Sequence, residues 1–112
     1  MEPEFERPWR KVLRADAIRV GEMRVARVGT RQVVVASTPT GVHVFRNHCP
    51  HAGAPLSGGK LPEDTITCPR HRWEFQLEDG HCPAHPIYTL RRFEVRVEDG
   101  WIFAQEEEEE IW

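Results

Sequence analysis

The sequence predicts a small all-β fold, an antiparallel sandwich or barrel that carries two loops on one extension. Three observations predict it: short runs rich in β-branched residues recur along the chain, turn signals separate them, and no long segment has the apolar spacing of a helix. A chain of 112 residues is long enough for a single domain with a modest core. We therefore expect one domain over residues 1–105.

The first half of the chain supplies four of the expected strands. They are residues 12–13, 23–28, 32–36 and 42–45, all short and rich in the residue types that favour strands. Residues 16–21 are few enough for one helical turn. Thr38-Pro39-Thr40-Gly41 is a turn signal, so the third and fourth runs are expected to be separate strands joined by a turn.

The second half supplies the remaining strands. Residues 65–67 and 72–75 flank a short loop, which we expect to be a hairpin end rooted on rigid strands. Residues 93–97 alternate apolar and polar with a period of two, as a half-buried strand does. Asp99-Gly100 is a strong signal for a tight turn before a last strand at residues 101–103.

Two short segments between these strands carry the residue types of a metal site. They are Cys49-Pro50-His51 and, after sixteen intervening residues, Cys68-Pro69-Arg70-His71. Thiolate and imidazole ligands bind iron, zinc and copper, whereas calcium and magnesium prefer oxygen ligands. The sequence therefore predicts a metal site made of two Cys and two His on two loops.

The order of these ligands separates two possible occupants. A mononuclear zinc finger usually takes two Cys from one segment and two His from another. Here each loop supplies one Cys and one His, which suits two metals better than one. In a [2Fe–2S] cluster each iron takes two protein ligands, and His₂ can replace Cys₂ on one iron. We favour the binuclear cluster; a structural zinc site in an interaction module is the alternative from a different class.

The segments around these ligands resemble a known family. Residues 49–56 (CPHAGAPL) and 68–75 (CPRHRWEF) are similar to the two cluster-binding boxes of the Rieske family, and most closely to those of the small Rieske-type ferredoxins that serve aromatic-ring dioxygenases. The resemblance continues through the turn at residues 80–83 and the hairpin at 93–105. It implies that Cys49 and Cys68 hold one iron of a [2Fe–2S] cluster, and that His51 and His71 hold the other. The cluster-binding loops would then span about residues 47–75.

The boxes depart from those of high-potential respiratory Rieske proteins. Those proteins carry a second Cys in each loop and join the two in a disulfide, whereas this chain has Ala54 and Arg70 there. They also place Ser and Tyr hydroxyl groups after the second His, at the positions that Trp73 and Phe75 occupy here. Fewer hydrogen bonds to the cluster sulfurs lower the potential. We expect a midpoint near the low end of the Rieske range of roughly −150 to +300 mV.

The sequence favours an electron carrier over an oxygenase. An oxygenase would need a further iron site with two His and a carboxylate, and the remaining His residues form no helical pair with an acid nearby: His43, His48, His81 and His85. We therefore expect no catalytic residue. The expected partners are transient: an NAD(P)H-dependent reductase as donor and a terminal oxygenase as acceptor. A small Rieske subunit of another oxidoreductase, such as assimilatory nitrite reductase, is the alternative within redox proteins.

Composition predicts a cytoplasmic location. Residues 1–8 are acidic and polar, unlike a secretory signal, and no apolar run approaches the length of a membrane span. Three Cys, two of them expected ligands, leave no pair for a structural disulfide. The net charge of −3 includes five consecutive Glu, so the rest of the chain is slightly positive and offers no strongly basic surface for nucleic acid.

Several residues outside the ligand set have expected roles. Residues 106–112 are expected to be an acidic, solvated tail. Cys82 is expected to be a buried structural thiol, His48 to point away from the metal, and Trp73 to exclude water. A small apolar patch next to two arginines is the expected docking face for a redox partner: Pro50, Ala52, Ala54 and Pro55, ringed by Arg70 and Arg72.

Overall fold

The computed structural model describes residues 8–51, 53–70 and 72–106. Its strands are β1 (Trp9–Arg14), β2 (Met23–Val28), β3 (Arg31–Thr38), β4 (Gly41–Arg46), β5 (Thr65–Thr67), β6 (Glu74–Gln76), β7 (Arg92–Phe93), β8 (Val95–Glu98) and β9 (Trp101–Gln105). The helical elements of these residues are two 3₁₀ turns, η1 (Ala15–Ala17) and η2 (Leu56–Gly58). The all-β prediction is confirmed.

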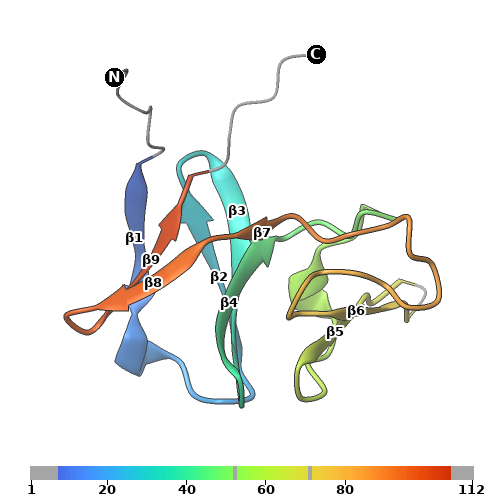
Figure 1. Ribbon diagram of the computed structural model, residues 1–112, viewed down its shortest axis with the longest axis horizontal. Coiled ribbons are helices and arrows are strands. Elements are labelled where there is room, and N and C mark those ends of the chain that lie inside the picture. The colour runs from blue at the N-terminus through green and yellow to red at the C-terminus, as the bar shows by residue number, and fades with distance from the viewer. Residues whose placement is uncertain (1–7, 52, 71, 107–112) are drawn as a thin grey trace, which may run out of the picture.

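The strands form three antiparallel sheets. In the body of the domain, one sheet has the order β1-β9-β8 and the other has the order β2-β3-β4-β7. The third sheet, β5-β6, lies in an extension at one side of the body (Figure 1). Within the described residues the two body sheets form a sandwich and do not close into a barrel. Of the two predicted alternatives, a sandwich and a barrel, the structure is therefore the sandwich.

The extension is an insertion between two neighbouring strands of the body. β4 and β7 are adjacent in one sheet, with Val44 opposite Phe93 and Phe45 opposite Arg92. The chain leaves β4, forms the extension and returns directly into β7 (Figure 1). At the neck, the Arg46 N–H donates to the Arg91 carbonyl oxygen at 2.9 Å. The two paired strands thus hold both ends of the segment that carries the predicted metal loops.

Strand β3 is buried on both faces, which explains its continuous apolar run. Val33 and Val35 pack with Ile102 between the two body sheets. Val34 and Ala36 point the opposite way and pack against the core of the extension. A strand covered on both faces shows no polar alternation. The four-stranded sheet is therefore a middle layer, shared by the body core and the extension core.

The run at residues 93–97 is not one continuous strand. Phe93 ends β7 in the four-stranded sheet, whereas Val95 begins β8 in the three-stranded sheet and pairs with Ala104. Glu94 lies between them, where the chain crosses from one sheet to the other. The predicted alternation holds at Phe93, Glu94 and Val95 but not at Val97, which is 52% exposed. The change of sheet partner was not predicted, because it depends on the position of β4.

The tight turn after β8 forms as predicted. Asp99 and Gly100 both have positive φ angles, +53° and +79°, as the turn of a two-residue hairpin requires. The turn joins Glu98 to Trp101, which face each other across the β8–β9 pair. In the part of the chain that the structure describes, we find no helix with the length and apolar character of a membrane span.

Candidate metal centre

The first predicted metal loop begins where β4 ends, and the side chain of Asn47 fixes it. The Asn47 N–H donates to the Gln32 carbonyl oxygen at 3.0 Å. Its Nδ2 atom donates to Gln32 Oε1 at 2.8 Å and to Ser57 Oγ at 3.1 Å, and its Oδ1 atom accepts the Ser57 N–H at 2.8 Å. One amide side chain therefore joins β3 in the body to η2 on the far side of the loop.

The second predicted metal loop joins β5 to β6, and a close contact at Gly59 fixes its base. A Cβ atom at residue 59 would lie only 1.7 Å from the Thr67 carbonyl oxygen, so no larger residue fits without movement of the backbone. Lys60 and Thr67 exchange backbone hydrogen bonds of 2.8 and 3.3 Å. Because Thr67 directly precedes Cys68, this contact sets the position of the second predicted thiol ligand.

The backbone of the two loops follows the same hydrogen-bond pattern. In the first loop the Cys49 N–H donates to the Ala54 carbonyl oxygen, and the Gly53 N–H donates to the Cys49 carbonyl oxygen, both at 2.8 Å. In the second loop the Cys68 N–H donates to the Trp73 carbonyl oxygen at 2.8 Å, and the Arg72 N–H donates to the Cys68 carbonyl oxygen at 3.0 Å. Each Cys thus holds the same position in its loop.

The two loops also place one residue each in the left-handed backbone region. Gly53 has a φ of +72° and Arg72 a φ of +61°, and each lies four residues after its Cys. Glycine adopts this conformation readily, whereas a residue with a Cβ atom is strained there. From the sequence, Arg72 was expected only as a cation of the docking face. The equal Cys-to-turn spacing of the two segments was the signal that this expectation did not use.

Both predicted thiol ligands are buried and both lie in the core of the extension. Cys49 and Cys68 have no exposed surface, and they belong to the same apolar cluster as Leu56, Ile66 and Phe75. His51 is half-buried, with its Nδ1 atom shielded from solvent. The fourth predicted ligand, His71, lies outside the described residues. The arrangement places sulfur ligands inside and the imidazole of His51 at the boundary with solvent.

Aromatic rings hold the imidazole of His51 on two sides. The ring of Trp73 stacks on it, with ring centroids 3.6 Å apart and an angle of 6° between the planes. Tyr88 approaches it edge-on, with centroids 5.6 Å apart and an angle of 72°. Trp73 packs, as expected from the sequence, and its partner is the imidazole of His51. Nothing in the sequence analysis indicated Tyr88, which comes from the loop before β7.

The donor set fits a binuclear iron–sulfur cluster. Among the described residues, which leave out His71, no three His, Cys, Asp or Glu side chains form a group that could hold one metal ion. A [2Fe–2S] cluster requires no such group, since each iron takes two protein ligands. Two buried thiols at equivalent positions of matching loops are the pair that a sulfur-ligated iron needs.

A carboxylate connects the second loop to the body. Asp64, directly before β5, accepts a hydrogen bond of 2.9 Å from the Thr40 hydroxyl at the β3–β4 turn. Hydrogen bonds from the Thr38 and Thr40 hydroxyls hold the pKa of Asp64 below its usual value. The His43 ring lies 3.2 Å from the same Thr40 hydroxyl; burial, and then the nearby Arg92 cation, lower the pKa of His43.

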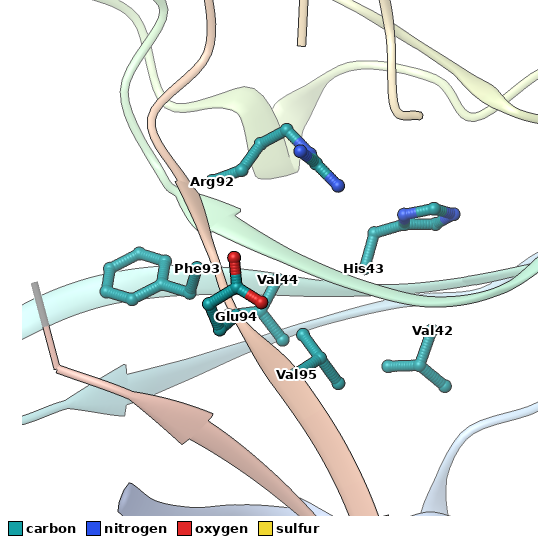
Figure 2. A pocket seen from close by; sticks show the side chains of 7 residues that line it. All are labelled: Val42, His43, Val44, Arg92, Phe93, Glu94 and Val95. Atoms are coloured by element: carbon teal, nitrogen blue, oxygen red, sulfur yellow. The ribbon is translucent and has the colours of Figure 1, made fainter. Parts of the chain in front are cut away.

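A polar hollow beside His43 lies on the body, where β7 leads into β8. It is lined by Val42, His43, Val44, Arg92, Phe93, Glu94 and Val95 (Figure 2). In Figure 2 the Phe93 side chain points away from those of His43 and Val42, as expected for a residue that packs between the sheets. The hollow contains none of the predicted ligands and lies apart from the metal loops in sequence.

The remaining residues that the sequence analysis singled out lie at or near the loops. Cys82 is buried in the extension core, as predicted for a structural thiol. His48 is exposed. Within the predicted docking face, Pro55, Arg70 and Arg72 are exposed and Ala52 lies outside the described residues. Of the predicted acidic tail, only Glu106 is described, and its side chain is paired with Arg10 on β1.

Curated relatives include both ferredoxins and larger redox enzymes. The chain is 33% identical over 97 residues to ferredoxin CarAc of Metapseudomonas resinovorans, covering 85% of this chain and 91% of that protein. It is 33% identical over 81 residues to the ferredoxin component of the alkene monooxygenase system of Xanthobacter autotrophicus, covering 71% and 66%. It is 31% identical over 110 residues to cholesterol 7-desaturase nvd of Drosophila melanogaster, covering 90% of this chain but only 26% of the enzyme. The chain spans about a quarter or less of the desaturase and oxygenase relatives that it matches first.

Solved structures share the fold. The terminal oxygenase of carbazole 1,9a-dioxygenase from Nocardioides aromaticivorans superposes with a TM-score of 0.84 at 21% identity, covering 95% of this chain and 32% of that one. A putative NADPH nitrite reductase small subunit superposes with a TM-score of 0.79 at 18% identity, covering 88% and 99%.

Residues 8–94 match the Rieske [2Fe-2S] domain, a segment that contains both metal loops, the whole four-stranded sheet and β1 of the three-stranded sheet. Proteins of this family bind a [2Fe–2S] cluster, so the zinc alternative is set aside. The chain belongs to the Rieske [2Fe-2S] domain family.

Proposed function

We propose that this chain is a one-electron carrier whose cluster is held by Cys49 and Cys68 on one iron and by His51 and His71 on the other. The observation that carries the proposal is the matched pair of loops, which bury two thiols at equivalent positions beside the half-buried imidazole of His51. When bound, the cluster takes up and releases one electron at a time. The protein keeps the thiols in an apolar core and holds the His51 imidazole near the surface, where a partner can approach.

We further propose a low reduction potential. Trp73 and Phe75 have no hydroxyl group to donate to a cluster sulfur; Phe75 is fully buried in the extension core and Trp73 is stacked on His51. Fewer donors to sulfur favour the oxidised state. We expect a midpoint in the lower part of the range of roughly −150 to +300 mV, measured by spectroelectrochemistry. A clearly positive midpoint would contradict this part of the proposal.

The proposed partners are an NAD(P)H-dependent reductase as donor and a terminal oxygenase as acceptor, in the cytoplasm. An oxygenase partner is supported by the ferredoxin relatives, one of which is the ferredoxin component of an alkene monooxygenase system. The nitrite reductase small subunit, matched over 99% of its length in fold, keeps a permanent-subunit role as the second candidate. Co-purification with a reductase subunit would favour the second candidate; turnover of an oxygenase by the separate chain would favour the first.

Ligand substitutions test the core of the proposal. We expect Cys49→Ser and Cys68→Ser to lose the visible absorbance of the cluster, and His51→Ala and His71→Ala to lose or strongly alter it. The exposed His48 provides the matched control, and His48→Ala is expected to keep the absorbance and the electron paramagnetic resonance (EPR) signal of the dithionite-reduced protein. A cluster that survives either Cys substitution unchanged, or that is lost in the control, would exclude this ligand set.

The docking face is tested through its charge. Arg70 and Arg72 are exposed on the second loop, and long-range charge raises the association rate at low salt. We expect Arg70→Gln together with Arg72→Gln to slow electron transfer with an acidic partner and to flatten its salt dependence. Arg24→Gln together with Arg27→Gln, the same loss of two positive charges on β2 of the body, is the control. Equal effects from the pair and the control would remove the docking role.

A further inference from the structure

The stack of rings on His51 continues beyond Trp73. The imidazole of His85 stacks on Trp73 with centroids 3.6 Å apart and an angle of 10° between the planes. Since His51 stacks on Trp73 at 3.6 Å and 6°, the three rings are nearly parallel, with the indole between two imidazoles. Tyr88 meets both His51 and Trp73 edge-on, at 5.6 and 5.3 Å. His85 is exposed and forms the outer end of this stack.

The loop before β7 holds His85 in this position from both sides. The His85 N–H donates to the Cys82 carbonyl oxygen, and the Tyr88 N–H donates to the His85 carbonyl oxygen, both at 3.0 Å. Cys82 is buried in the extension core, which anchors the start of the loop. Pro86 follows His85 and restricts its backbone. Two consecutive turns on a buried anchor therefore fix the backbone of an exposed histidine, and direct its ring onto Trp73.

Parallel stacking constrains the direction in which the nitrogen lone pair of His51 points, and this direction decides how well the imidazole binds a metal. The lone pair of an imidazole nitrogen lies in the plane of the ring, so a tilt of the ring turns the lone pair away from the metal. A stacked neighbour at 3.6 Å prevents tilting but allows rotation within the plane. Trp73 can resist tilting only if its own plane is fixed, and its outer face is covered by His85.

We propose that His85 is a positioning residue for His51, acting through the indole of Trp73. The inference rests on the proposed ligand role of His51. It assigns a task to a histidine that is not a proposed ligand and that lies on a different loop from both metal segments. The task requires a flat ring at residue 85; it does not require the ring nitrogens to bond or to change protonation.

Three substitutions at one position test this requirement. His85→Phe keeps a flat ring, His85→Leu keeps apolar cover without a ring, and His85→Ala removes both. The readout is the pattern of ¹⁴N hyperfine couplings from the two imidazole ligands in pulsed EPR of the reduced protein, together with the midpoint potential. We expect Phe to give the wild-type pattern, and Leu and Ala to change the coupling of one imidazole and to shift the potential. His81→Ala, a second histidine of the same loop that is bonded to Asp79 instead, is the control and should match wild type.

The outcomes separate the two proposals. If the wild-type protein shows no imidazole nitrogen coupling, the proposed ligand set is wrong. If wild type shows both couplings and His85→Leu matches it, residue 85 merely covers Trp73, and the positioning role is overturned. If His85→Phe differs from wild type as much as His85→Ala, the histidine acts through its nitrogens, which also overturns the role. Spectra are normalised to bound iron, so partial loss of folded protein in one variant leaves the comparison intact.

Discussion

The two metal loops share one backbone design but are anchored in different ways. Each loop closes the same two hydrogen bonds around its Cys and turns at the fourth residue after it. The first loop is fixed by the amide of Asn47 and turns on a glycine, whereas the second is fixed by the close contact of Gly59 with Thr67 and turns on Arg72. The same local geometry is therefore reached through different residues, so the two loops should fail in different ways when they are altered.

The largest effect is expected where the second loop is anchored. In Gly59→Ala the new Cβ atom would lie 1.7 Å from the Thr67 carbonyl oxygen, which is backbone and cannot turn aside. We expect a loss of unfolding free energy at or above the upper end of the ~1–3 kcal/mol typical of overpacking, together with loss of most of the bound cluster. Chemical denaturation and the iron content of the purified protein measure both.

The neighbouring glycine supplies a matched control for this substitution. At Gly58 a Cβ atom would meet Pro69 Cγ at 3.7 Å, an ordinary van der Waals contact. Gly58→Ala should therefore leave the cluster content unchanged. Equal losses in the two variants would show that the contact with Thr67 does not set the second loop.

The anchor of the first loop should give a smaller effect. Asn47→Ala removes three side-chain hydrogen bonds and leaves the Ser57 N–H without its acceptor. Loss of a partner of a part-buried polar group costs about 1–3 kcal/mol, so we expect a destabilisation in this range with partial retention of the cluster. Ser57→Ala removes one of these bonds and should cost less. A destabilisation in Ser57→Ala equal to that in Asn47→Ala would mean that neither the side-chain bond to Gln32 nor the bond from the Ser57 N–H contributes.

The sequence alone predicted most of the strands, the two Cys and two His candidates and the family resemblance, but neither the break between β7 and β8 nor the anchors. Alternation and turn chemistry are local, so residues 23–28, 32–36 and 99–100 were interpreted correctly. The contact of Gly59 with Thr67 depends on two segments meeting in space, and a Gly-Gly pair in a loop does not indicate it. The stack of His85 on Trp73 joins residues from different loops, so no periodic pattern in the sequence predicts it.

Gly53 and Arg72, the two residues with left-handed backbone, allow the loops to be compared directly, because the residue type of one loop can be placed in the other. A residue with a Cβ atom in the left-handed region costs about 1–2 kcal/mol, and a glycine loses more backbone entropy on folding by roughly 0.5–1 kcal/mol. Arg72→Gly should therefore stabilise the protein by about 0.5–1 kcal/mol. Gly53→Ala should destabilise it by about 1 kcal/mol, because the nearest atom to the new Cβ, in His48, is 3.6 Å away and crowding adds nothing.

Thermal unfolding of the two single variants and of the double variant measures these changes in stability. The double variant should lie close to wild type, since the two positions are in separate loops and their effects should add. If Arg72→Gly lowers stability, the side chain of Arg72 makes a contribution that outweighs its backbone strain, and the comparison between the loops must be revised.

The smallest effect concerns pH; it should arise at the carboxylate that leads to the second loop and at His43 on β4 of the body, and not at the amide anchor of the first loop. The Asn47 amide does not titrate, whereas Asp64, which leads through β5 to Cys68, does. Hydrogen bonds from Thr38 and Thr40 lower the pKa of Asp64, so its contribution to stability is present above the unfolded-state pKa and is lost as the pH falls through the folded-state pKa. His43 has a pKa lowered by burial and by Arg92, so unfolding takes up a proton and stability falls once the pH drops below the usual histidine value of 6.5.

These two groups act in separate pH windows, which allows them to be distinguished. His43→Gln should flatten the loss of stability that begins just below pH 6.5, and Asp64→Asn should flatten the loss that occurs below the usual carboxyl value of 3.8. Denaturation midpoints measured across pH 3 to 7 provide the test, with Asn47→Ala as the variant whose pH profile should run parallel to wild type. A profile for Asn47→Ala that flattens in either window would mean that acid acts on the first loop as well. The difference between an amide anchor and a carboxylate anchor would then not govern how the loops respond to pH.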